Sequence, residues 1–316
     1  MHISNPNNGR GVVLSEAAQL ASVRISQFGS DKKDKQASNQ LAIDKKATKR
    51  SVKVSKRMYD ECFPKTRRQA SRIRNDILYN YTFALPMNGG GQQKGPRLLP
   101  TKLAESFLDE VTSAIDTFHN YADEECAKLD EWQDRERERL GDLYRESDYM
   151  SGEDVRSKFH AEVFVDGMPT IESINAGHHS DRMKAKAAER ESRMVSEVNK
   201  QLLIRMLENV SHMANTLDKE KTKIFPSLFD NVRELVEVII PAANINDDAE
   251  INELCESMKK TLRYNAGEVK AAAGAKKSIQ SAAKKAAKQI GKAAKDAGIT
   301  KADLSTQQQA KASAYF

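Results

Sequence analysis

Two long stretches of this chain, residues 101–140 and 181–223, carry apolar side chains in steps of three and four. That spacing is the period of a helix with one apolar face, and about 40 residues of it correspond to roughly 60 Å of helix. The pattern therefore predicts two long amphipathic helices that pair as an antiparallel hairpin or coiled coil. The apolar positions are Leu108, Val111, Ile115, Phe118, Ala122, Cys126, Leu129 and Trp132 in the first stretch, and Val195, Val198, Leu202, Met206, Val210, Met213 and Leu217 in the second.

Shorter patterns predict a small β element and further helices around this hairpin. Alternating apolar and polar residues are typical of half-buried strands, and prolines or a capping Asp mark the ends of helices. We expect strands near 23–28, 51–56 and 159–165, helices over 34–47 and 64–79, a helix between Pro226 and Pro241, a helix after Asp248, and a glycine-rich loop over 85–100.

The predicted fold class is mainly α with a minor β component. It consists of the long antiparallel helical hairpin, the small β element and a flexible basic C-terminal tail. We expect three consecutive regions. They are a basic α/β region with the glycine-rich loop at 1–100, an acidic helical body at 101–265 with one strand near 159–165, and a Lys/Ala-rich tail at 266–316.

Charge is distributed very unevenly along the chain. The net charge is +6, but residues 270–301 contain nine lysines and one acidic residue, and residues 31–76 carry a net charge of +9. Residues 77–269 are left with a net charge of −12. Two interpretations stay open: the basic regions dock on the acidic body or on a protein partner, or they are exposed and bind an anionic polymer.

The Lys/Ala tail has the sharpest functional interpretation. Alanine favours helix, but its isolated isoleucines form a stripe too thin to bury, so we expect a marginal helix that forms better on an anionic partner. Lysines that neutralise phosphates bind nucleic acid without reading its sequence, and residues 270–301 contain no aromatic side chain for stacking on single strands. The candidate nucleic-acid-binding residues are Lys276, Lys277, Lys284, Lys285, Lys288, Lys292, Lys295 and Lys301 in the tail, with Lys45, Lys46, Lys49, Arg50, Arg67, Arg68, Arg72 and Arg74 nearer the N-terminus.

No motif in the chain indicates an active site. The three cysteines are far apart and match no zinc spacing, and the neighbouring His178 and His179 lack a spaced third ligand. The Gly89–Gly91 run is not followed by the Lys and Ser/Thr of a phosphate-binding loop. We therefore expect no enzyme activity, no metal and no cofactor. Without a signal-peptide pattern or a long apolar run, we expect a cytoplasmic protein that does not enter a membrane.

Three stretches together resemble domain-of-unknown-function family 3150. They are Phe83 to Pro100, Leu140 to Phe159, and Phe229 to Leu235 followed by Asn244-Ile245-Asn246. With the VRISQFG and SVKVSKRMY segments, the resemblance covers roughly residues 20–265 and leaves the basic tail outside. The family occurs in phages and bacterial mobile elements, often beside genes for MoxR-type AAA+ ATPases. It has no established activity, so the resemblance implies an accessory role and no catalytic residues.

These observations predict a non-enzymatic phage or mobile-element accessory that binds DNA electrostatically, independent of sequence, during DNA processing or recombination. One alternative is an oligomeric structural adaptor that partners a MoxR-type AAA+ ATPase, since long amphipathic helices favour homo-oligomers. Another is a virion or nucleoid-packaging protein. The sequence alone does not distinguish single-stranded from double-stranded targets, or DNA binding by the tail from its docking on the acidic body.

Overall fold

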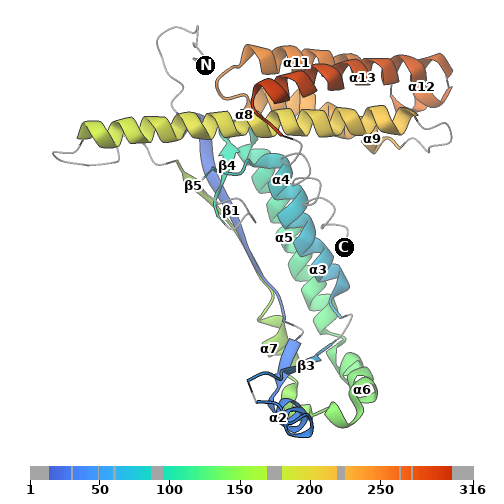
Figure 1. Ribbon diagram of the computed structural model, residues 1–316. Coiled ribbons are helices and arrows are strands. Elements are labelled where there is room, and N and C mark those ends of the chain that lie inside the picture. Colours follow the sequence, from blue (N-terminus) through green and yellow to red (C-terminus); the bar gives the residue numbers. More distant parts are fainter. Residues whose placement is uncertain are drawn as a thin grey trace. The chain divides into compact units, whose positions relative to one another are not determined.

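The computed structural model describes residues 14–29, 31–48, 50–59, 62–86, 95–168, 180–218, 225–262, 265–271 and 273–300. Helices dominate it, and the strands form one three-stranded and one two-stranded sheet (Figure 1). This confirms the predicted mainly α fold class with a minor β component.

The chain forms two compact units, and each draws on segments far apart in the sequence. Unit 1 takes in the described parts of Met1–Ser22, Ile77–Leu108 and Phe164–Phe316, and unit 2 takes in those of Val23–Asp76 and Asp109–Val163. This division differs from the three consecutive regions expected from the sequence, because chain order does not determine which segments pack together.

Unit 1 is mostly helical. Its sheet strands, β1 and β4, pair antiparallel, and β1 continues into unit 2. The elements are α1 (Leu14–Ala17), β1 (Ala18–Ser26), α4 (Leu78–Tyr81), β4 (Arg97–Pro100), η2 (Thr101–Leu103), α8 (Ser180–Asp218), α9 (Ser227–Glu234), the π-helical η5 (Leu235–Ile239), α10 (Ile240–Ala243), α11 (Ala249–Lys259), η6 (Lys260–Leu262), α12 (Ala266–Ala271) and α13 (Ala273–Asp296).

The core of unit 1 forms where α8 packs against α13, with α9, η5, α10 and α11 beside them. The predicted apolar stripe of α8 is confirmed, since Val198, Leu202 and Met206 are buried and the stripe continues to Leu217. The predicted helix after Asp248 is confirmed too. The Asp248 side chain accepts hydrogen bonds from the first backbone N–H groups of α11, at 3.0 Å from Glu250 N, as a helix cap does.

The prediction of a flexible tail is wrong for residues 273–300, because these residues pack into this core. Ile279 and Ile290 of α13 are 2% and 0% exposed, and Ala283 and Ala286 are fully buried. The stripe is narrow because alanine is small, but small side chains let two helices approach closely, so a narrow stripe still excludes water. The helix is therefore part of the bundle.

The two long stretches, 101–140 and 181–223, were also predicted to pair with each other, and this pairing is wrong. Helix α8 packs mainly against α13. The first long stretch is divided at residues 127–128 into α5 (Ala104–Cys126) and α6 (Leu129–Leu140), and α5 beyond Leu108 belongs to unit 2. There it lies antiparallel to α3 (Pro64–Arg72), because Lys65 lies near Glu125 and Arg72 near Glu110. Periodicity identified most of the buried face of each helix, although Leu108 of the predicted stripe is exposed and Phe107 is buried instead, and it did not identify the partner.

The predicted strands are present but lie in two sheets. One sheet has the order β4-β1-β5, with β5 at His160–Gly167, and the boundary between the units falls inside β1 and β5. The other pairs β2 (Asp31–Asp34) with β3 (Val54–Arg57) in antiparallel register. Strand β4 lies within the segment expected to be a loop, whose residues 87–94 lie outside the described ranges. The four residues of β4, Arg97–Pro100, are buried and pair with β1.

Unit 2 has an aromatic core. Phe63 lies at its centre, with its ring centroid 4.8 Å from that of Phe159 and 5.2 Å from that of Trp132. Trp132 is the only tryptophan of the chain, so its fluorescence reports on unit 2. The further elements of unit 2 are α2 (Lys35–Asp44), the π-helical η1 (Ile73–Ile77, which ends at the unit boundary), η3 (Gly141–Leu143), η4 (Glu146–Asp148) and α7 (Gly152–Arg156).

A buried ion cluster also holds unit 2 together. The side chain of Lys56 in β3 is 2% exposed, and its ammonium lies 3.2 Å from Asp34. It also pairs with Asp148, and this hydrogen bond holds the pKa of Asp148 below its ordinary value. A buried lysine needs such partners because an unpaired charge is costly away from water.

A carboxylate from α5 caps the N-terminus of α3. Phe63 precedes α3 in a left-handed conformation and provides no side-chain cap. Instead the buried Glu125 accepts the backbone N–H of Lys65 at 2.9 Å and both the N–H and hydroxyl of Thr66, at 3.1 and 2.6 Å. A negative charge there also interacts favourably with the helix dipole. Glu125 therefore joins α3 to α5.

We expect Glu125→Ala to reduce the free energy of unfolding of unit 2 by about 2 kcal/mol, since a helix cap and a buried acceptor are both lost. Trp132 fluorescence during urea unfolding of the full chain measures this. The control is Glu124→Ala, which removes only an exposed ion pair to Lys65 and is expected to cost about 0.5 kcal/mol or less. Equal shifts for the two variants would contradict the capping role.

Candidate nucleic-acid interface

Helix α13 carries its lysines on the side opposite its buried face. It contains seven lysines and one acidic residue, Asp296. At 100° per residue, six of the lysines fall within an arc of about 100°, centred opposite the arc of Ile279, Ala286 and Ile290. All six are exposed. We call this surface the lysine face; its members are Lys277, Lys284, Lys285, Lys288, Lys292 and Lys295.

The seventh lysine, Lys276, lies off this arc and is half-buried. From Lys277 to Lys295 the lysine face extends about 27 Å along the helix at 1.5 Å per residue. The bundle holds its backbone in place. Gly291 lies against Leu207 of α8, and Ser257 of α11 donates a 2.7 Å hydrogen bond to Gln289. The structure thus presents six predicted residues together on one rigid helix.

The second predicted basic region is more dispersed. Arg72 forms a 3.1 Å ion pair with Glu110, and Arg74 donates a 2.8 Å hydrogen bond to the carbonyl of Ile25. Both contacts lie within unit 2 and have a structural explanation. The remaining described members are half-buried Arg67 and exposed Lys45, Lys46, Arg50 and Arg68, and the candidates Lys49 and Lys301 lie outside the described residues. This region belongs to unit 2, whereas the lysine face belongs to unit 1.

A groove beside α13 limits the lysine face on one side. It has a volume of about 570 Å³ and is lined by residues of α10, α11, η6 and α13. Its wall carries both signs of charge: Glu253 and Glu256 from α11, with Lys259, Lys260 and Lys285. Lys259 pairs with Glu256 at 2.5 Å. The α11 side is therefore less attractive to an anion than the outward side of α13.

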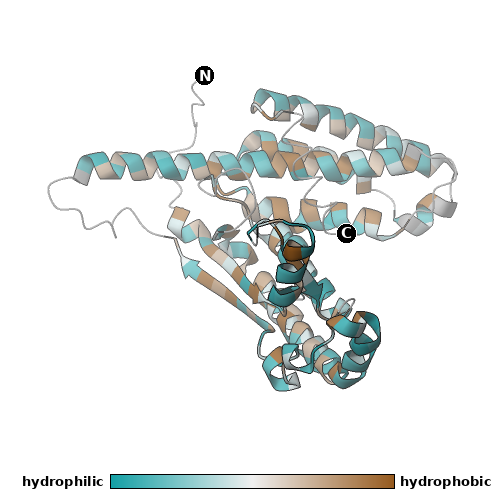
Figure 2. Ribbon diagram, turned by 60° about the horizontal axis from the view of Figure 1, so that its bottom comes forward, coloured by the Kyte–Doolittle hydropathy of each residue, from teal (hydrophilic) through white to brown (hydrophobic). Residues whose placement is uncertain are grey.

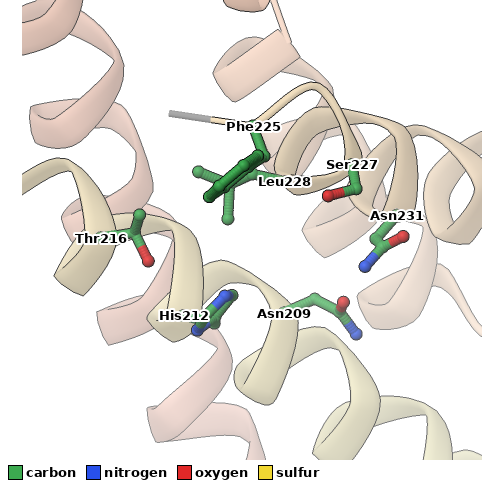
Figure 3. Close-up of a pocket in the computed structure, with 7 residues that line it drawn as sticks. All are labelled: Asn209, His212, Thr216, Phe225, Ser227, Leu228 and Asn231. Atoms are coloured by element: carbon green, nitrogen blue, oxygen red, sulfur yellow. The ribbon is translucent and has the colours of Figure 1, made fainter. Parts of the chain in front are cut away.

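A small pocket lies between α8 and α9, with Asn209, His212 and Thr216 facing Ser227 and Asn231 (Figure 3). Its volume of about 100 Å³ is enough for a few water molecules. His212 is the one titratable side chain of its lining. His212 is exposed on α8.

No pattern in the sequence indicated the roles of two buried arginines, Arg205 and Arg97. Arg205 of α8 donates hydrogen bonds to the carbonyls of Asn80 at 3.1 Å and Thr82 at 2.6 Å. Arg97 of β4 donates to the Thr82 hydroxyl at 2.6 Å and to the Thr82 carbonyl at 3.1 Å, and burial lowers the pKa of Arg97 to about 10. These carbonyls lie at the C-terminal end of α4, where cations are favourable. The two arginines therefore fasten α4 to α8 and β4.

Comparison with known proteins adds no identity: no family model, no curated protein and no solved structure matches this chain significantly. The resemblance to family 3150 stays a prediction. Within the described ranges, no three His, Cys, Asp or Glu side chains gather as a metal site, and none of the helices is long and apolar enough to cross a membrane. His178 and His179 lie outside those ranges.

Proposed function

We propose that this chain binds nucleic acid electrostatically through the lysine face of α13, without reading its sequence. The observation that carries the proposal is the arrangement of six exposed lysines on the outward side of a packed helix. Each lysine that neutralises a phosphate releases condensed counterions, and this release is the main source of non-specific affinity.

Because α13 is packed, it is expected to bind nucleic acid more tightly than the mobile tail predicted from the sequence would. A flexible lysine segment would lose conformational entropy on binding, which reduces affinity. On α13 the backbone is ordered before the ligand arrives, because Ile279, Ala286 and Ile290 are buried in unit 1. Only the lysine side chains remain to be ordered. The affinity per lysine is therefore expected to be higher than for an unstructured tail of the same composition.

The residue types on α13 favour phosphate contact over base recognition. Base edges in the major groove are read by paired hydrogen bonds from Arg or Lys to guanine and from Asn or Gln to adenine. Helix α13 contains neither Arg nor Asn; of its two glutamines, Gln289 accepts a hydrogen bond from Ser257 and Gln280 is half-buried. The proposed role is therefore that of a non-catalytic accessory, and its place in phage or mobile-element DNA processing rests on the family resemblance alone. The adaptor and packaging functions stay predictions.

Binding of the full chain to duplex DNA is expected to fall steeply with salt. Six phosphate contacts predict a slope of about −5 for log K against log salt, or a loss of about 1,000-fold between 50 and 200 mM. Fluorescence anisotropy with duplexes of unrelated sequence measures both the slope and the sequence dependence. Absence of binding at 50 mM would contradict the proposal and move the adaptor function to first place.

A further inference from the structure

The first part of α8 extends beyond the bundle as an exposed helix. Between Asp181 and Arg193 every residue is exposed except Ala187 and Glu191, which are half-buried, and the first buried residue is Met194. Figure 1 shows α8 continuing past the end of α13, and Figure 2 shows that this part of α8 is largely hydrophilic. It is a helix with solvent on most of its surface, so its side chains are available for a partner.

One side of this exposed part is basic. Leu207 marks the side of α8 that contacts α13, through Gly291. At 100° per residue, three basic residues of the exposed part lie within about 60° of the direction of Leu207, together with Glu189 and with the half-buried Lys200 further along α8. Glu189 pairs with one of them, Arg193. We call the basic set the α8 row; its members are Arg182, Lys186, Arg193 and Lys200.

Within unit 1, the α8 row follows the lysine face along the axis of α8, beyond the C-terminal end of α13. Helix α13 runs antiparallel to α8, so its C-terminal end lies near the middle of α8, where the exposed part begins (Figure 1). With Gly291 beside Leu207, the distance along the α8 axis from Lys277 to Arg182 is about 58 Å at 1.5 Å per residue. A straight duplex of that length contains about 17 base pairs at 3.4 Å each.

The composition of the two helices favours a duplex over a single strand. Proteins that bind single strands combine basic grooves with aromatic side chains on which bases stack. Neither α8 nor α13 contains Phe, Tyr or Trp. Cations held on two packed helices match the regularly spaced phosphates of a stiff double helix, whereas a flexible single strand without stacking would lose more entropy when it is aligned.

We infer that the lysine face and the α8 row form one continuous binding track for about 17 base pairs of double-stranded DNA, an inference that rests on the proposed function. The lysine face binds one part of the duplex, and the exposed part of α8 contacts phosphates further along it. Affinity is then expected to rise with duplex length up to about 17 base pairs and to change little beyond that. A lysine face acting alone, about 27 Å long, would reach its full affinity near 8 base pairs.

The test uses two matched variants of the full chain, each losing one Lys and one Arg from exposed positions of the same helix. R182Q/K186Q removes charge from the track, whereas K184Q/R190Q removes it from other sides of α8. We expect the first to weaken binding of a 20-base-pair duplex roughly tenfold or more at 100 mM salt and to make the salt slope less steep by about 2. The second variant is expected to bind like the parent.

The remaining outcomes distinguish the two proposals. If the parent binds duplex but both variants lose the same affinity, or affinity is already complete at 8 base pairs, the track is overturned while the proposed function stands. Tighter binding of a 20-nucleotide single strand than of the duplex would overturn the choice of ligand. Absence of duplex binding by the parent at low salt would overturn the proposed function itself.

Discussion

Replacing Lys285, Lys288, Lys292 and Lys295 by glutamine is expected to weaken duplex binding at least about 100-fold at 100 mM salt. Four phosphate contacts are lost, so the slope of log K against log salt should become less steep by about 3 to 4. All four side chains are exposed, and glutamine is a good helix former, so the fold is expected to persist. Anisotropy titrations at several salt concentrations measure the effect, and circular dichroism checks the helix content.

The matched control removes four lysines from unit 2. Lys33, Lys35, Lys45 and Lys46 are exposed, and their replacement by glutamine changes the net charge by the same amount. If the lysine face is the interface, this variant should keep most of its affinity. An equal loss would mean that binding follows net charge alone, and a larger loss would transfer the interface to the basic region of unit 2.

Ile290→Asp is expected to unfold the helical bundle of unit 1 or to destabilise it by about 4 kcal/mol. Ile290 is fully buried at the contact between α13 and the rest of the core, and a carboxylate there would lose its hydration without gaining a partner. Thermal unfolding followed by far-ultraviolet circular dichroism measures the change. Lys288→Asp is the control, because it places the same carboxylate on the exposed side of α13.

A melting temperature of Ile290→Asp equal to that of Lys288→Asp would contradict the packing of α13 and would mean that residues 273–296 form a tail.

The packing of α13 also decides which variants can test the function. Truncation before Ala273 would remove the lysine face, but it would also expose the apolar residues of α8 that α13 covers. Loss of DNA binding by such a truncation would therefore not separate a missing interface from an unfolded one. Substitutions at exposed positions avoid this ambiguity.

The helical periods in the sequence were sufficient to predict much of the local structure. The apolar stripe of α8, the cap at Asp248 and the strands around Ile25 and Val163 were all predicted, because hydrophobic spacing and capping depend on neighbours in the sequence. The same period also predicted a helix in the Lys/Ala segment, but not the burial of its alanine side, which leaves the lysines on the opposite side. These features are properties of short segments, so one sequence is enough to identify them.

The tertiary structure alone decided which surfaces meet. An alanine stripe such as that of α13 is buried only because α8 offers a partner surface, and nothing within residues 273–296 specifies that partner. The burial of Arg205 likewise depends on the carbonyls of Asn80 and Thr82, more than a hundred positions earlier in the chain. Burial is a property of two surfaces brought together, so a pattern within one segment determines its local conformation and the face that packs, whereas the partner is set by the free energy of the whole fold.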